Sequence, residues 1–214
     1  MRTSERRKAF ITLARKRVRP GSGSHPAFLG ARTVRVPIVD LQRLIRDTPF
    51  VVVGGVATRL YMPERSTLDI DVLVRAVDLP KLEHELGRAG AQKLGDLSIG
   101  GSSWRLPDGT VLDVIASSAP WVEPALAQPR QGPEGLPYAD LPYLILLKLQ
   151  ASRAQDLADV SRMLGAADPQ AIERVRAAVQ RHLPEAAEDL ESLIALGKLE
   201  LSGSEDAPPR ETSG

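Results

Sequence analysis

The sequence predicts an α/β (α+β) fold, in which a mixed sheet flanked by helices is followed by a C-terminal helical subdomain. Apolar, strand-like runs alternate with helical patterns between residues 37 and 118. A proline-rich stretch at 119–142 interrupts this alternation, and residues 143–201 carry helical patterns only. We therefore expect a core domain with three to five strands at 37–118, a linker at 119–142 and a helical subdomain at 143–201.

The composition is that of a soluble globular protein. Hydrophobic residues make up 43% of the 214 residues and charged residues 26%. No apolar run approaches the ~20 residues of a membrane span, so we expect no membrane partner. The chain has no cysteine and three widely spaced histidines, which excludes disulfides and thiolate chemistry and argues against a zinc site. A chain without cysteine suits the reducing cytoplasm, where we expect the protein.

The first 36 residues are basic, whereas the rest of the chain is acidic. They contain ten Lys or Arg residues and one acid, Glu5, which leaves 18 basic and 26 acidic residues for the remainder. Residues 5–19 predict a short helix with four residues near one face, namely Phe10, Leu13, Ala14 and Arg17. Two interpretations stay open for residues 1–36. They are a partly disordered, solubilising arm, or an arm that binds RNA phosphates or an acidic partner.

The first predicted strand leads into a double glycine. An amphipathic helix is expected at 37–46, and the β-branched and aromatic run at 50–53 then ends at Gly54-Gly55, before helical residues 56–61. The glycines therefore lie at a helix N-terminus. Unpaired backbone N–H groups and the missing Cβ atoms suit the close approach of a phosphate there. A tight turn without a ligand is the alternative.

The next predicted strand carries two aspartates on one face. Residues 68–74 are strand-like, and Asp69 and Asp71 are two residues apart, so their side chains project to the same side. Neighbouring carboxylates repel each other, and such a pair is typical of a divalent-cation site. Ligands that are all oxygens favour Mg²⁺, with Mn²⁺ as its substitute. A solvated strand end is the alternative.

A helix and a hairpin follow. The helix is expected to begin at Asp78, and an Asp-Gly turn at 108–109 joins strands at 102–106 and 110–115. Asp113 lies among apolar residues of the second strand, where an unpaired buried carboxylate would be unfavourable. We expect Asp113 to join Asp69 and Asp71 at the metal. The alternative is a strand-end carboxylate that reaches solvent or an arginine.

The C-terminal part predicts helices at 143–150, 154–164, 169–181 and 184–199, and a disordered tail at 202–214. If residues 147–160 formed one helix, Lys148, Asp156 and Asp159 would share a face. Two interpretations stay open for this polar helix face: a solvated surface with ordinary ion pairs, or part of a ligand site.

The order of these features resembles the nucleotidyltransferase superfamily, particularly its small bacterial members of the AbiEii toxin and minimal nucleotidyltransferase type. The resemblance covers roughly residues 38–164 and rests on the double glycine, the segment Arg65-Ser-Thr-Leu-Asp-Ile-Asp71 and the later strand aspartate. It implies a nucleotidyltransferase-like core with Asp69, Asp71 and Asp113 as catalytic residues and metal ligands. It also implies a set of nucleotide-binding residues, which are Gly54, Gly55, Thr58, Arg65, Ser66, Thr67, Lys148, Asp156 and Asp159.

The implied activity is Mg²⁺-dependent transfer of NMP from an NTP to a hydroxyl group on RNA, such as tRNA, or on protein. The toxin-like branch implies a role in a toxin-antitoxin or phage-defence system and a cognate antitoxin as partner. Gly55 favours that branch, because polymerase-like members have serine there. Gln155 departs from the family, which commonly has arginine at that position. The alternatives are a glycosyltransferase, against which the third carboxylate argues, and a non-catalytic nucleotide- or RNA-binding regulator on the same fold.

Overall fold

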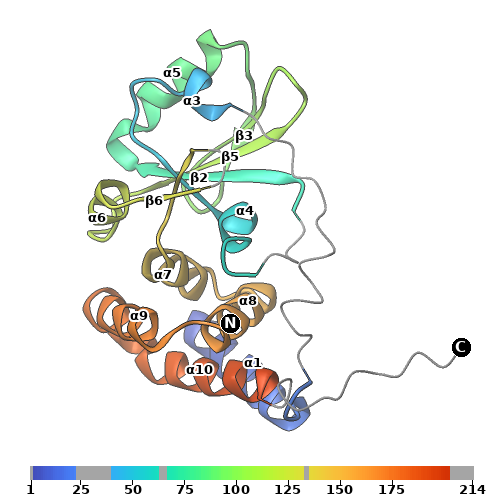
Figure 1. The fold of residues 1–214 in the computed structure, drawn as a ribbon. Coiled ribbons are helices and arrows are strands. Elements are labelled where there is room, and N and C mark those ends of the chain that lie inside the picture. The colour runs from blue at the N-terminus through green and yellow to red at the C-terminus, as the bar shows by residue number, and fades with distance from the viewer. Residues whose placement is uncertain (1, 23–39, 63–66, 133–134, 203–214) are drawn as a thin grey trace, which may run out of the picture.

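The computed structural model describes residues 2–22, 40–62, 67–132 and 135–202, which form a seven-stranded mixed sheet beside a layer of helices (Figure 1). The strand order is β3-β4-β5-β2-β1-β7-β6. This confirms the predicted α/β class. Five of these strands lie within residues 37–118, in agreement with the three to five predicted there, and the other two come from the proline-rich segment. The strands are β1 (Val51–Val53), β2 (Asp69–Arg75), β3 (Gln92–Asp96), β4 (Gly101–Arg105), β5 (Val111–Ser117), β6 (Arg130–Gln131) and β7 (Pro137–Tyr138).

The centre of the sheet contains the strands with the strongest apolar patterns. β2 pairs in parallel with β5 and antiparallel with β1, and β4 and β5 form the predicted hairpin. The three valines of β1 are buried, as expected for a strand covered on both faces. The register places Asp71 beside Asp113 on β5 and beside Val53 on β1. Sheet pairing therefore brings the two aspartates together.

The strands that sequence patterns miss lie at or next to the edges of the sheet. All five residues of β3 are exposed, so this strand shows no apolar alternation. The proline-rich segment contributes α6 (Val122–Ala127), the edge strand β6 and its neighbour β7, with Tyr138 beside Val52. Proline is tolerated where a strand begins or at a sheet edge. Residues 119–142, which were predicted as a linker, thus contribute a helix and two short strands that pair with the sheet.

Helices cover both faces of the sheet (Figure 1). α3 (Leu41–Leu44) and α5 (Leu79–Arg88), with the 3-10 turn η1 (Ala76–Asp78) before it, lie on one face, and α4 (Gly54–Thr58) and α7 (Leu141–Ala151) on the other. Of the helix predicted at 37–46, residues 41–44 are helical and residues 45–46 are not. Residues 37–39 lie outside the described ranges.

The four predicted C-terminal helices are present. They are α7, α8 (Ala154–Gly165), α9 (Pro169–His182) and α10 (Ala187–Leu201), with the 3-10 turn η2 (Pro184–Ala186) before α10. The single helix considered for 147–160 is not formed, because Ser152 takes the left-handed conformation with φ 49° and ends α7. Within the described ranges no helix combines the length and apolarity that a bilayer span requires. The predicted tail from 203 onward lies outside the described residues.

The basic head, which is the segment of residues 1–36, begins with a packed helix, α1 (Thr3–Arg17). This helix contacts α10 and α8. Its buried residues are Arg7 and Ile11, whereas Leu13, which was expected on the apolar face, is 50% exposed. Of the predicted face, Phe10 and Ala14 do pack against the core. The helix is therefore anchored by a buried arginine as well as by apolar side chains. The first half of the expected arm is thus part of the folded protein, and residues 23–36 lie outside the described ranges.

Candidate functional site

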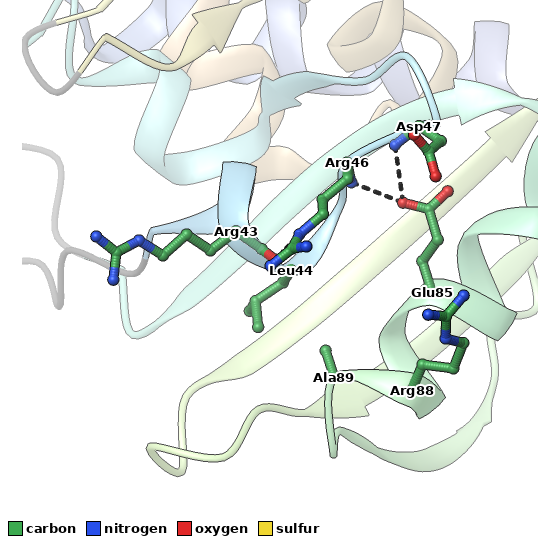
Figure 2. Close-up of a pocket in the computed structure, with 7 residues that line it drawn as sticks. All are labelled: Arg43, Leu44, Arg46, Asp47, Glu85, Arg88 and Ala89. Atoms are coloured by element: carbon green, nitrogen blue, oxygen red, sulfur yellow. Dashed lines mark hydrogen bonds between the residues drawn. The ribbon is translucent and has the colours of Figure 1, made fainter.

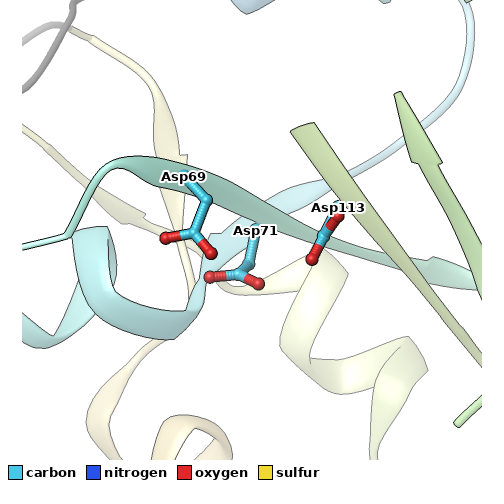
Figure 3. Close-up of side chains that lie close together, drawn as sticks. All are labelled: Asp69, Asp71 and Asp113. Atoms are coloured by element: carbon cyan, nitrogen blue, oxygen red, sulfur yellow. The ribbon is translucent and has the colours of Figure 1, made fainter. Parts of the chain in front are cut away.

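The structure brings together the three aspartates that the sequence singled out (Figure 3). Asp69 and Asp71 come from β2 and Asp113 from β5, and each offers a carboxylate oxygen within 4.8 Å of the others. Adjacent parallel strands and a spacing of two residues along β2 are sufficient to produce this cluster.

The charges of the cluster are poorly compensated by the protein. Burial raises the pKa of Asp71 to about 6, and repulsion from Asp69 and Asp113 adds to the effect, while the Gly55 N–H and Arg153 oppose it. Asp113 Oδ1 is buried and accepts no hydrogen bond from the described residues. An unpartnered carboxylate oxygen and a repelling pair are what a hard divalent cation would relieve. The donor set therefore fits Mg²⁺ or Mn²⁺.

The double glycine makes room for these side chains. Gly54 has φ +61°, and a Cβ atom on it would lie 1.8 Å from Asp71 Oδ2. A Cβ atom on Gly55 would lie 2.7 Å from Thr67 Cβ. The Gly55 N–H donates a hydrogen bond to Asp71. In this structure the glycine turn thus leaves room for the Asp71 carboxylate and donates a hydrogen bond to it. A contact between this turn and a phosphate stays a prediction.

The hydroxyl groups near the turn have protein partners. Thr58 is buried, and its Oγ1 donates to the Gly54 carbonyl at 2.7 Å, which closes the single turn of α4. Thr67 Oγ1 donates to Asp69 Oδ1 and so orients a carboxylate of the cluster. The other two predicted contacts in this loop, Arg65 and Ser66, lie outside the described residues.

Lys148, Asp156 and Asp159 meet across the corner between α7 and α8 instead of along one helix. Lys148 Nζ lies 2.7 Å from Asp159 Oδ2 and 3.6 Å from Asp156 Oδ1, and all three side chains are buried. The prediction that they lie together is correct, although the geometry behind it is not. A buried cation between two acids holds the two helices together, and its contact with a nucleotide stays a prediction.

Arg153 is the site residue that sequence reasoning missed. It directly precedes α8, where its Nε lies 2.6 Å from Asp156 Oδ2, yet its side chain is 75% exposed. Its charge also lowers the pKa of Asp71, so this guanidinium lies near the aspartate cluster. The signal was available: Arg153 lies between Lys148 and Asp156 in the same polar stretch.

The buried ion pairs of Lys148 predict a large loss of stability for Lys148→Met. Removal of Lys148 takes away the cation that lies 2.7 Å from the buried Asp159 carboxylate, whereas Asp156 keeps its pair with Arg153. Breaking a buried ion pair by removing one partner lowers the free energy of unfolding by about 3–5 kcal/mol. Urea unfolding at pH 7.5 measures the effect. Adding Asp159→Asn to this variant removes the negative charge that Lys148 contacted and should restore part of the loss. An unchanged unfolding midpoint in Lys148→Met would contradict this structural role.

A separate pocket of about 600 Å³ lies where α3 meets α5 (Figure 2), on the face of the sheet away from α4 and α7. Three arginines line it, Arg43, Arg46 and Arg88, together with Leu44, Asp47, Glu85 and Ala89. Glu85 Oε2 accepts the backbone N–H groups of residues 46 and 47. None of the predicted site residues lines this pocket.

No protein-family model and no curated protein matches the chain. Several solved structures show a distant likeness. Antibiotic-resistance factor ANT(2'')-Ia in solution is 21% identical with a TM-score of 0.37, over 72% of this chain and 83% of that chain. ANT(2'')-Ia in complex with adenylyl-2''-tobramycin is 23% identical with a TM-score of 0.36, over 72% and 88%. The Thermotoga maritima CCA-adding enzyme complexed with tRNA is 16% identical with a TM-score of 0.38, over 82% of this chain and 54% of that one. Since these scores are low, function has to be inferred from the site residues.

Proposed function

We propose that the protein is a Mg²⁺-dependent nucleotidyltransferase, which transfers NMP from an NTP to a hydroxyl acceptor. The observation that carries the proposal is the cluster of Asp69, Asp71 and Asp113, with an unpartnered buried oxygen on Asp113. Arg153 supplies a cation from the opposite, helical side. Carboxylates for a metal and a nearby guanidinium for phosphates are the groups that phosphoryl transfer needs.

The reaction forms a bond between the acceptor oxygen and the α-phosphorus and breaks the bond between that phosphorus and the bridging oxygen of pyrophosphate. Bound by the three aspartates, Mg²⁺ would offset the negative charge of the triphosphate. Asp113 Oδ1, which has no partner among the described residues, is placed to take the proton of the acceptor hydroxyl. Arg153 binds phosphate oxygens through charge-assisted hydrogen bonds, and Lys148 keeps the α7–α8 corner in place.

The basic face of α1 favours RNA over protein as the acceptor. The exposed basic side chains of this helix are Arg6, Lys8, Arg15, Lys16 and Arg17. The helix is packed on α8 and α10, so these charges are held on a fixed surface. Polyanionic RNA gains affinity for such a surface through counterion release. The resemblance of the sequence to the toxin-like branch extends the proposal to a toxin with a cognate antitoxin.

The decisive test is incubation of the protein with each labelled NTP, Mg²⁺ and either total cellular RNA or total protein. We expect label in the RNA fraction, and loss of transfer when EDTA is added. Label in the protein fraction would support the nucleotidyltransferase activity but would show that the acceptor is protein instead of RNA. Nucleotide binding without transfer to either fraction would favour the non-catalytic regulator. In a parallel incubation with labelled nucleotide sugars, transfer of the labelled sugar would favour a glycosyltransferase.

The triple variant Arg6→Gln, Lys16→Gln and Arg17→Gln should weaken RNA binding. Removing three phosphate contacts lowers the slope of log K against log salt by about 2.7 for a duplex and about 2 for a single strand. Fluorescence anisotropy with labelled tRNA at several salt concentrations measures it.

The matched control removes the same charge from the pocket between α3 and α5, by Arg43→Gln, Arg46→Gln and Arg88→Gln (Figure 2). This control should bind RNA as the parent does, because these arginines lie on the other face of the sheet. Equal losses in the two variants would show that only net charge matters and that α1 is no specific surface.

A further inference from the structure

We propose that Arg7 is a positioning residue, which couples the N-terminal helix to the site by holding the corner between α7 and α8. The inference rests on the proposed function, since the group positioned is the Arg153 guanidinium. It gives the basic head a second role that does not depend on RNA.

Arg7 is a buried charge that the reaction itself does not use. Arg7 is 2% exposed, and its Nε lies 2.7 Å from Asp189 Oδ2 on α10. Its Nη1 donates to the Leu149 carbonyl at 3.3 Å and to Ser152 Oγ at 3.4 Å. One guanidinium thus joins α1, α10 and the last turn of α7.

The contact falls on the point where the chain turns toward the site. Carbonyl groups in the last turn of a helix lack intrahelical donors, and a cation there is favourable. Ser152 has φ 49°, a conformation that L-residues other than Gly adopt only when their surroundings impose it. The Ser152 hydroxyl donates to the Leu149 carbonyl, the same oxygen that Arg7 binds. The next residue is Arg153, whose guanidinium is held at 2.6 Å from Asp156 Oδ2 beside Lys148, and its charge also acts on Asp71.

A purely structural role would require only the ion pair with Asp189. A buried pair of this kind can be replaced by apolar residues without loss of stability. The bonds to Leu149 and Ser152 are different, because they fix the backbone from which Arg153 projects. Lysine cannot reproduce them, since its single ammonium lacks the planar fork that reaches two elements at once.

The test uses the full chain with Arg7→Met and Asp189→Leu combined, so that no buried charge is stranded. The control is Arg176→Met with Glu191→Leu, which removes the α9–α10 ion pair at 2.6 Å in the same subdomain. Hydrogen exchange of the amides in 149–157 should be at least about tenfold faster in the Arg7 variant than in the control, while α9 stays protected. This readout needs no activity.

The second readout is the affinity of the protein for nucleotide. Loss of one charge-assisted contact predicts a rise of about 10- to 100-fold in KM for the NTP, and in the Kd of a non-transferable NTP analogue, with a smaller change in kcat. In an Arg153→Ala background the Arg7 variant should add little, because both changes remove the same contact.

Additive effects, unchanged exchange at 149–157, or faster exchange with unchanged nucleotide affinity would each overturn the inference. A parent protein that binds the analogue but transfers to no acceptor would instead refute the proposed reaction, while exchange and Kd still decide the role of Arg7. A parent that binds no nucleotide would refute both.

Discussion

Asp71→Asn should abolish nucleotide transfer while the protein stays folded. Asp71 lies between Asp69 on its own strand and Asp113 on the neighbouring strand, so the amide removes the central carboxylate of the cluster. Mutation of a residue that only supports a metal ligand typically lowers metal affinity or activity by about 10- to 100-fold. Loss of a ligand itself should therefore lower the rate of transfer by at least about 100-fold. Transfer of labelled nucleotide, measured at several Mg²⁺ concentrations, gives the effect.

The same substitution should stabilise the metal-free protein at alkaline pH. The pKa of Asp71 is about 6 in the folded protein, above the ~3.9 of an unfolded chain. The folded state thus holds the proton more tightly, so this favourable contribution is complete below pH ~4 and is lost as the pH rises through about 6. In EDTA at pH 8, Asp71→Asn should therefore unfold with a free energy about 2–3 kcal/mol higher than the parent. The difference should shrink toward pH 4.

Urea unfolding in EDTA at pH 8 and at pH 5 measures this difference. Asp96→Asn is the control, because this carboxylate is 79% exposed at the edge strand and pairs with Lys93. It should leave transfer unchanged and shift stability by no more than about 0.5 kcal/mol. An active Asp71→Asn protein would mean that the reaction occurs elsewhere, and a variant less stable than the parent at pH 8 would make Asp71 a structural residue.

The parts of the fold that could be predicted are those where a local pattern has one physical outcome. The buried valines of β1, the Asp-Gly hairpin and the spacing of Asp69 and Asp71 each determine local geometry, and sheet pairing then places Asp113 beside them. β3 escaped prediction because all its residues are exposed, and β7 because it begins with a proline. Strands at or next to a sheet edge depend on the neighbour that they pair with, which local periodicity does not encode.

The helical side of the site was harder to predict for a different reason. The pattern from Lys148 to Asp159 suits one continuous helix, and only the left-handed Ser152 reveals a corner. That conformation depends on tertiary contacts, above all on Arg7, which lies 145 residues away in sequence from Ser152. Arg153 acquires its place near Asp71 only through this corner. Residues that act across two distant segments are therefore the ones that sequence reasoning missed.

Gly54→Ala should disable the site by displacing Asp71. The new methyl group would lie 1.8 Å from Asp71 Oδ2, so the carboxylate has to move, and the backbone has to keep φ near +61°. The left-handed conformation costs an alanine roughly 1–2 kcal/mol, and the overcrowding adds about 1–3 kcal/mol. Since a misplacement of about 1 Å can cost 100-fold in rate, we expect transfer to fall at least that far.

Gly109→Ala separates backbone strain from displacement of the carboxylate. Gly109 also has a positive φ, +90°, but a Cβ atom there would meet nothing within 4 Å, so this variant should lose stability through strain alone and keep its activity. In an Asp71→Ala background the carboxylate that clashes is absent, and only the Cβ atom of residue 71, at 2.8 Å, stays close. The unfolding free energy lost through Gly54→Ala should therefore fall toward the strain component of roughly 1–2 kcal/mol. If Gly54→Ala costs the same in both backgrounds, the glycine serves only its own turn, and the close approach of Asp71 is no requirement of the site.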